Sequence, residues 1–552
     1  MTVIEVNKKD LLNLVGKNLS DQELGDTLFL LKCETVVSND DIEIELNPDR
    51  PDMLSVEGVA RALKSYLNIE TGLKKYGVAS GNHKLTAEDV RARPSIACSV
   101  IKNVNLTDEL VASLMQIQEK LHLTLGRQRK KVAIGIHDFD KIEGPFLYKE
   151  VDPNKVKFVP LDETKEMNLG EILNKHPKGK DYAHLLMKYS KYPIIFDKNK
   201  NVISFPPIIN GELTKVTKKT KNLFIDVTGT DEDAVSSVLN ILVCNITERG
   251  GEIESVFVNE KEFPDLTPKT IKVSTNNLNN LLGLGIDEKD LHTLLGRMGY
   301  DVMDIKGQEF HILIPPYRFD ILHEVDIIED IAIAYGYNNI EPIIPKIATM
   351  GDLTEETVFT NKVRDLLVGL GFQEYVGYIL TNKNKQFYLM NTFEEPVVEL
   401  ENFVSSEYDV CRKHLLPSLM GFLASNKHEP YPQNIFEAGN CVVLDKDEPE
   451  SGTRTIKKVA AVVSKDDVNL TEIKSLMESV LRNIGISDYE IRPYKHPSFI
   501  ETRCGVVVAN GERLGIFGEF HPEALTNWQL DRAVAGFELN LDIIKKLSHP
   551  TE

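Results

Sequence analysis

Four carboxylates lie close together in YRFDILHEVDIIEDIAIAYGY, residues 317–337: Asp320, Asp326, Glu329 and Asp330. At about 100° per residue in an α-helix, the last three share one arc of about 100° around the helix axis. Asp320 precedes this predicted helix and can fold back toward it. Oxygen donors without cysteine suit a hard cation such as Mg²⁺ or Ca²⁺. The spacing is therefore compatible with a metal site.

The same pattern is also typical of a solvated acidic helix face, since acidic residues near a helix N-terminus are favoured by the helix dipole. Two features favour a bound cation or a partner surface instead. No Lys or Arg occurs between Arg318 and Lys346, so the helix offers no basic residue for i,i+4 ion pairs. Ile333 falls inside the acidic arc and would be exposed to water there. From the residues alone, both interpretations stay open.

Local patterns predict the elements that would position these side chains. Ile327, Ile328 and Ile331 lie opposite the acidic arc and predict a helix with one buried side. Residues 41–46, DIEIEL, alternate polar and apolar and predict a strand. Ser55 and Asp287 each precede a segment with helical apolar spacing, and both are predicted to cap those helices.

The predicted elements group into four units, which gives an α/β and α+β multidomain fold class. A small α+β unit spans residues 1–84, and a longer mixed unit spans 85–262. After the Pro/Thr-rich segment FPDLTPKT (263–270), a small helix-rich unit spans 268–345 and a last α+β unit spans 350–552. Each is long enough to bury a core of its own.

The composition indicates a cytoplasmic protein with no membrane segment. No apolar run approaches the ~18 residues of a membrane span, and the six scattered cysteines include no CxxC pair. A net charge of −20 argues against nucleic-acid binding over the whole surface. Residues 171–222 are an exception, with eleven Lys against four acidic residues. This lysine-rich segment either attracts a phosphate backbone or is a solvated face.

Several segments resemble the β subunit of phenylalanyl-tRNA synthetase. The acidic segment, extended to PPYRFDILHEVDIIEDIAIAYGYNNIEP, is similar to the metal-carrying segment of that family. NPDRPDMLSVEGVARAL resembles its N-terminal domain, and HPSFIETRCGVVVANGERLGIFGEFHPEAL resembles its C-terminal domain. KKVAIGIHDFDKIEGPFLY, VISFPPIINGEL and LFIDVTGTD look like its editing domain. The matches follow the family's order and fit its compact archaeal and eukaryotic type.

The resemblance implies identities for the four units: an N-terminal domain, a B3/B4-like editing domain, a B5-like domain and a class II synthetase-like antiparallel sheet domain. It implies that Asp320, Asp326, Glu329 and Asp330 bind Mg²⁺ at a site associated with the α subunit. It also implies that the chain works with that α subunit, as an (αβ)2 heterotetramer, and with tRNA(Phe).

The last domain is expected to be catalytically degenerate. Class II synthetases stabilise the phosphates of ATP with arginines, one of them in a Gly-rich setting at the strand that opens the final helix. The corresponding stretch, AGFELNLDIIKKL (535–547), lacks that setting, and no arginine follows Arg532. We therefore expect the α subunit to bind ATP and attach phenylalanine to tRNA.

The editing domain is the expected place for chemistry in this chain. An apolar pocket rejects an added hydroxyl only ~10²-fold, so discrimination against tyrosine benefits from a second, hydrolytic site. The resemblance assigns Ser204, Asp226 and Thr228 to that pocket. Asp226 and Thr228 would face the same side of a strand, although Asp-x-Thr-Gly is also common in turns. We expect water-mediated hydrolysis of tyrosyl-tRNA(Phe).

Two questions stay open within this expectation. His137, in GIHDFD, either lines the same pocket or is a hydrogen-bonded core histidine, and we favour the core position. The alternative function is a scaffolding or tRNA-binding subunit whose editing pocket is inert.

Overall fold

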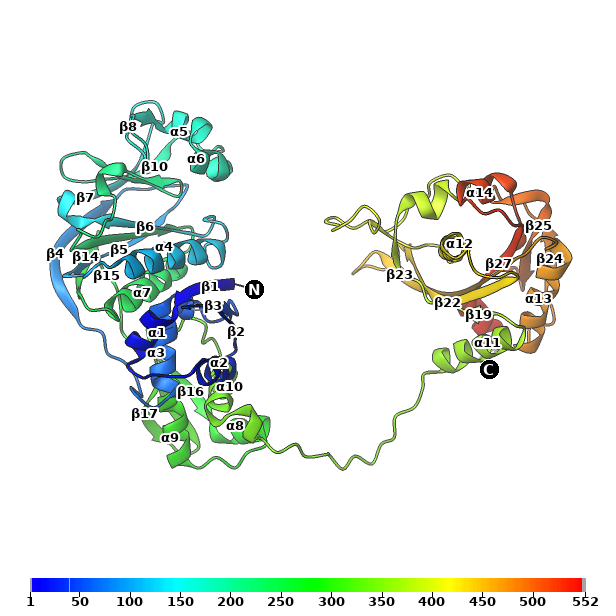
Figure 1. Cartoon of the computed structure of the whole chain (residues 1–552), viewed down its shortest axis with the longest axis horizontal. Coiled ribbons are helices and arrows are strands. Elements are labelled where there is room, and N and C mark those ends of the chain that lie inside the picture. Colours follow the sequence, from blue (N-terminus) through cyan, green and yellow to red (C-terminus); the bar gives the residue numbers. More distant parts are fainter. Residues whose placement is uncertain (1, 39, 549–552) are drawn as a thin grey trace. The chain divides into compact units, whose positions relative to one another are not determined.

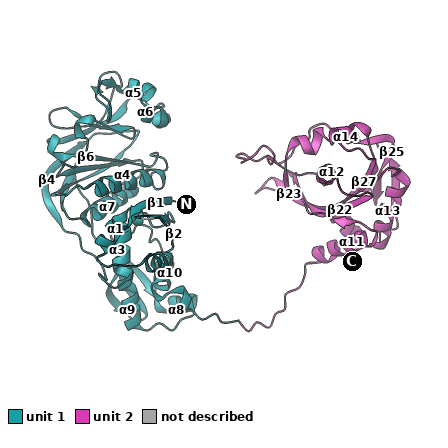
Figure 2. Cartoon of the chain, in the orientation of Figure 1, with its two compact units in different colours: residues 1–344 teal, residues 345–552 magenta. Residues whose placement is uncertain are grey.

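The computed structural model describes residues 2–38 and 40–548. The chain divides into two compact units, residues 1–344 and 345–552, which Figure 2 distinguishes by colour. No helix in the described part of the chain has the length and apolar character needed to cross a membrane.

The first unit begins with a three-stranded antiparallel sheet and three helices. The strand order is β1 (Thr2–Asn7), β3 (Asp41–Leu46), β2 (Cys33–Ser38). The helices are α1 (Lys8–Val15), α2 (Asp21–Leu30) and α3 (Val56–Tyr66). As predicted, residues 41–46 form a strand and Ser55 caps α3, where its hydroxyl accepts a hydrogen bond from the Gly58 amide.

A ten-stranded sheet forms the centre of the first unit (Figure 1). Its order is β12 (Ile209–Asn210), β11 (Val202–Phe205), β10 (Tyr192–Phe196), β7 (Phe146–Val151), β4 (Val78–Ala87), β14 (Glu252–Val258), β5 (Ser95–Lys102), β13 (Leu223–Gly229), β6 (Val132–Asp138), and β15 (Lys261–Phe263) pairs with β14. Helix α7 (Glu232–Thr247) packs on β5 and β13, and α4 (Asp108–Leu123) contacts β6. Every residue of β13 is buried, which places any polar side chain on it inside the protein.

Smaller elements lie beside β10 and have a separate apolar core. They are β8 (Lys157–Phe158), β9 (Met167–Asn168), α5 (Leu169–Lys175) and α6 (Pro177–Tyr182). Helices α5 and α6 carry part of the lysine-rich segment.

The first unit ends with a second three-stranded antiparallel sheet and three helices. The strand order is β16 (Lys269–Ser274), β18 (Glu309–Ile314), β17 (Asp301–Lys306), and the helices are α8 (Thr275–Leu282), α9 (Glu288–Arg297) and α10 (Glu324–Tyr335). Asp287 caps α9 by accepting a hydrogen bond from the Asp290 amide at 2.8 Å, as the sequence predicted.

The second unit is built on a seven-stranded sheet covered on both faces. Its order is β19 (Gln373–Glu374), β22 (Gln433–Leu444), β23 (Thr453–Ser464), β27 (Val534–Asn540), β26 (Glu512–Phe520), β25 (Phe499–Ala509), β24 (Glu490–Pro493); only the β19–β22 pair in this described sheet is parallel. Alternate residues of β23 enter two different cores, as the period of two in a strand requires. One core includes α11 (Glu355–Gly369), α13 (Leu470–Asn483) and α15 (Leu541–Ser548), and the other includes α12 (Leu416–Ser425) and α14 (Pro522–Asn527).

Candidate functional site

A cavity of about 530 Å³ opens beside β13, β11 and α6 in the first unit. Ser204, Asp226 and Thr228 all line it, so the structure brings together the three residues that the resemblance assigned to one pocket. Much of the remaining wall is apolar, with side chains from Leu114, Ile134 and Ile208. A cavity of this volume can hold a small-molecule ligand or an amino-acid side chain.

Asp226 and Thr228 lie within strand β13 and not in a turn. Asp226 pairs with Gly135 of β6 on one side and with Cys98 of β5 on the other. Two positions apart on a strand, Asp226 and Thr228 point to the same side of the sheet and into the cavity. Their exposures are 1% and 0%, so the turn interpretation of Asp-x-Thr-Gly is wrong for this chain.

The Asp226 carboxylate forms a hydrogen bond with the buried side chain of His137. His137 Nε2 lies 2.7 Å from Asp226 Oδ2, and His137 Nδ1 lies 2.8 Å from the hydroxyl oxygen of Thr214. His137 is fully buried and does not line the cavity. The favoured interpretation as a hydrogen-bonded core histidine therefore fits its position, but its partner is a cavity residue. Sequence reasoning did not find this pairing, because the two residues are 89 positions apart.

Gly135 provides the space that the Asp226 carboxylate occupies. A Cβ at position 135 would lie 2.0 Å from Asp226 Oδ2 and 2.6 Å from His137 Nε2, far inside van der Waals contact. Sequence reasoning missed this glycine. Its position two residues before His137, on the same strand side, is the signal that could have found it.

Ser204 reaches the cavity from β11. Its hydroxyl donates a hydrogen bond to Asn210 Oδ1 of β12 at 3.1 Å, and Asn210 also lines the cavity. This amide was not predicted. Ser204 and Asn210 are cross-strand partners, so hairpin pairing joins these two polar side chains at one wall.

Cationic side chains stand at the rim of the cavity. Arg129, Lys178 and Lys215 line it, and Lys178 and Lys215 belong to the lysine-rich segment. Seven lysines of this segment form no ion pair within the described residues: Lys178, Lys180, Lys188, Lys191, Lys200, Lys219 and Lys221. All seven are exposed. Of these seven lysines, Lys178 lines the cavity, so the segment places one unpaired positive charge there.

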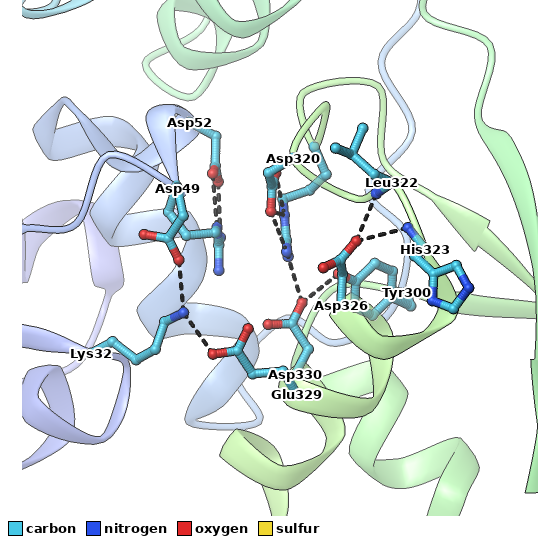
Figure 3. A network of polar contacts seen from close by, with 12 residues as sticks. Lys32, Asp49, Asp52, Tyr300, Asp320, Leu322, His323, Asp326, Glu329 and Asp330 are labelled. Carbon is cyan, nitrogen blue, oxygen red and sulfur yellow. Dashed lines mark hydrogen bonds and ion pairs between the residues drawn. The ribbon is translucent and has the colours of Figure 1, made fainter. Parts of the chain in front are cut away.

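The predicted acidic cluster gathers around the first turn of α10 (Figure 3). Asp326 acts as a cap there. One of its carboxylate oxygens accepts hydrogen bonds from the backbone amides of Leu322 and His323, both at 2.8 Å. This carboxylate therefore stabilises the helix N-terminus locally.

Arg318 forms ion pairs with both Asp320 and Asp330. The guanidinium approaches Asp320 Oδ2 and Asp330 Oδ2, each at 2.8 Å, and Asp330 also accepts a hydrogen bond from Tyr300. Asp330 and Arg318 are each 4% exposed. Burial acts to lower the pKa of Arg318, but the neighbouring carboxylates raise it well above its ordinary value. A buried, charge-assisted cluster of this kind is held tightly.

Glu329 is neutralised by a residue from the start of the chain. Lys32 Nζ lies 2.9 Å from Glu329 Oε1 and 2.7 Å from Asp49 Oδ2, so it bridges the two carboxylates (Figure 3). The helix itself has no basic i,i+4 partner, as the sequence indicated, but Lys32, 297 positions away, supplies a cation for Glu329. Ile333, expected to be exposed beside these acids, is 2% exposed.

The arrangement does not fit a four-carboxylate metal site. Among residues 2–38 and 40–548, no three His, Cys, Asp or Glu side chains are placed to hold a metal ion. Arg318, Lys32 and the backbone amides bind at least one oxygen of each carboxylate, whereas Asp326 Oδ1, Glu329 Oε2 and Asp330 Oδ1 accept no hydrogen bond or ion pair from the described residues. The Mg²⁺ assignment stays a prediction that rests on the resemblance.

Comparison with known proteins gives a consistent family. Family models match as "B3/4 domain" over residues 93–242, "tRNA synthetase B5 domain" over 271–337 and "Phenylalanyl tRNA synthetase beta chain CLM domain" over 340–541.

Full-length relatives are similar along almost the whole chain. The chain is 41% identical to a phenylalanine–tRNA ligase β subunit of Methanococcus maripaludis and 42% identical to that of Methanocaldococcus jannaschii, and each alignment covers 98% of this chain and 100% of the relative. An N-terminal fragment of the phenylalanyl-tRNA synthetase β subunit from Pyrococcus horikoshii is 40% identical, with a TM-score of 0.58 over 60% of this chain and 99% of the fragment. The chain therefore belongs to the phenylalanyl-tRNA synthetase β subunit family.

Proposed function

We propose that this chain is the β subunit of a phenylalanine–tRNA ligase and that its α subunit partner attaches phenylalanine to tRNA(Phe) with ATP, in an (αβ)2 complex. Relatives named as that subunit align with this chain over their whole length. The second unit supports a non-catalytic role in ligation, because its buried cations are already neutralised. Arg412 Nη1 lies 2.7 Å from Glu437, and Lys458 Nζ lies 2.8 Å from Glu538. Neither cation is free to meet a triphosphate.

The chemistry of this chain, in the proposal, is the hydrolysis of tyrosyl-tRNA(Phe) in the β13 cavity. The observation that carries it is the Asp226 carboxylate, 1% exposed, in the wall of a largely apolar cavity. A carboxylate accepts a hydrogen bond from the phenol of tyrosine. Phenylalanine has no such donor and would leave the buried carboxylate unpaired on that side. The cavity thereby selects the mischarged amino acid.

Water is the nucleophile in this proposal. The imidazole of His137 is engaged by Asp226 and by Thr214 on its two nitrogens, so it does not act as a base for Ser204. Ser204 and Thr228 present hydroxyl groups to the cavity, and these can orient a water molecule toward the ester. Hydrolysis then depends on the position of water and on groups of the substrate itself.

The test is an assay with the chain co-purified with its α subunit. We expect aminoacylation only when both chains are present. We expect Asp226→Ala to slow hydrolysis of tyrosyl-tRNA at least ~10²-fold and to leave aminoacylation unchanged. The matched control is Asp197→Asn, which alters a buried carboxylate of the same unit outside the cavity. Normal clearance by Asp226→Ala would favour the alternative, a scaffolding subunit with an inert pocket.

Mg²⁺ at Asp320, Asp326, Glu329 and Asp330 takes no part in this proposal. Because Arg318 and Lys32 already form ion pairs with three of these carboxylates, no step of the reaction is assigned to the ion.

A further inference from the structure

Arg93 is buried directly behind the cavity. It lies in the loop before β5 and is 2% exposed. Its Nε donates a hydrogen bond to Thr228 Oγ1 at 3.1 Å, and its Nη2 donates to the Thr228 carbonyl oxygen at 2.5 Å. The Nη1 group donates to the Arg129 carbonyl oxygen at 3.0 Å. Arg93 does not line the cavity, so it acts on a bound molecule through the groups that it holds, which are the Thr228 hydroxyl and the backbone carbonyls of Thr228 and Arg129.

Arg93 forms no ion pair with any carboxylate of the described residues. Five Lys and Arg residues are buried in the described part of the chain, and four of them contact an acid; these are Arg61, Arg318, Arg412 and Lys458. The Arg93 guanidinium instead meets a hydroxyl and backbone carbonyls. Burial lowers the pKa of Arg93 to about 10, although the charge of Asp226 acts to raise it, so the group stays charged near pH 7. A buried charge without a direct ion pair is costly, and here it lies against a cavity residue.

Hydrogen-bond direction at Thr228 follows from the chemistry of arginine. A guanidinium only donates, so the Thr228 hydroxyl oxygen must accept from Arg93 Nε. The single hydroxyl proton of Thr228 is then left for another acceptor. No acceptor for it occurs among the described residues, and Thr228 borders the cavity. The proton is therefore available to a molecule bound there.

We propose that Arg93 is a positioning residue that fixes the Thr228 hydroxyl as a hydrogen-bond donor to the ester carbonyl of the bound substrate. The proposal rests on the editing function above. Water adds to the carbonyl carbon, and the bond to the ribose oxygen breaks. One water proton passes to the ribose oxygen, and tyrosine leaves as its carboxylate with the other proton released to solvent. Negative charge on the carbonyl oxygen grows during addition, and the Thr228 donor stabilises it. Arg93 strengthens that donor because polarised hydrogen bonds reinforce each other.

A double-mutant cycle tests the proposal in the full α–β complex, with tyrosyl-tRNA hydrolysis as the measurement. We expect Thr228→Val to lower kcat ~10²-fold with little change in KM, since the donor acts mainly in the transition state. We expect Arg93→Lys to lower kcat about 10-fold by the same route. The double variant should be close in rate to Thr228→Val alone, because the proposed effect of Arg93 passes through that hydroxyl and not through its bonds to the Thr228 and Arg129 carbonyl oxygens. The control is Asp197→Asn, which alters a buried carboxylate of the same unit that does not line the cavity.

Three outcomes would overturn the proposal. The first is a double variant whose loss equals the product of the two single losses, which makes the residues independent. The second is a Thr228→Val variant with wild-type kcat. The third outcome is used if Arg93→Lys does not fold. In that case, a Thr228→Ser variant, which keeps the hydroxyl donor, would overturn the proposal by being as slow as Thr228→Val. If the wild-type complex hydrolyses no tyrosyl-tRNA, the editing function itself fails and this inference falls with it. A wild-type complex that is active while the cycle is additive rejects only the role of Arg93.

Discussion

Gly135→Ala places a methyl group where the Asp226 carboxylate lies. The new Cβ would be 2.0 Å from Asp226 Oδ2 and 2.9 Å from Asp226 Cγ. Since non-bonded carbon contacts need about 3.5 Å, the carboxylate oxygen must move by about 1.5 Å. That shift breaks the 2.7 Å contact with His137 Nε2. Misplacing a binding group by about 1 Å costs roughly 10²-fold in rate, and overpacking costs about 1–3 kcal/mol in stability.

The assay compares hydrolysis of tyrosyl-tRNA with aminoacylation by the same complex. We expect Gly135→Ala to lose about 10²-fold in hydrolysis and to keep its aminoacylation rate, because the second unit and the α subunit are not changed. Gly77→Ala is the matched control, since a Cβ there has no heavy atom within 4 Å. A folded Gly135→Ala variant with wild-type hydrolysis would refute the role of Asp226 in binding the tyrosine phenol.

Three further predictions concern the charged cluster and the N-terminal domain. Arg318→Met leaves the buried Asp330 without its cation and should lower the free energy of unfolding by about 3–5 kcal/mol. Lys32→Ala removes a partly exposed ion pair and should lower it by less than about 1 kcal/mol. Urea unfolding measures both values, and equal losses would contradict the difference in burial. If the cluster binds Mg²⁺, as the resemblance implies, Lys32→Ala should strengthen that binding in calorimetric titration, since Glu329 loses its competing cation; unchanged affinity would show that Glu329 joins no cation site. Burial acts to raise the pKa of Asp52, but Arg50 and other guanidinium groups outweigh it and lower that pKa to about 2. The ionised Asp52 carboxylate therefore contributes about 2 kcal/mol to the free energy of unfolding above pH ~4, and this contribution is lost as pH falls toward 2. The melting temperatures of wild type and Asp52→Asn should accordingly converge near pH ~2.

Helices and strands that depend on local sequence patterns could be predicted. The alternation of residues 41–46, the cap at Ser55 and the cap at Asp287 each depend on residues within four positions, and each element is present. The placement of Asp226 and Thr228 on one side of a strand followed from the same period of two. These features need no knowledge of the rest of the fold.

Contacts between distant residues could not be predicted in the same way. Lys32 meets Glu329 across 297 positions, and Arg93 meets Thr228 across 135. Neither pairing leaves a periodic signal, because the sheet order and the packing of separate elements create it. The absence of basic residues close to the acidic helix in the sequence was a correct observation, but it did not reveal the ion pair that Lys32 forms with Glu329.

The two sites differ in how completely their polar groups have partners. Around α10, Arg318 and Lys32 form ion pairs with three of the four predicted carboxylates, and backbone amides bind the fourth, Asp326. Each of these carboxylates therefore has a partner within the protein. At the β13 cavity, the buried guanidinium of Arg93 forms no ion pair among the described residues, and the Thr228 hydroxyl that it contacts retains a proton to donate. An incomplete set of partners is what a substrate can complete, so the cavity is the stronger indication of chemistry even though the acidic cluster is the more conspicuous pattern in the sequence.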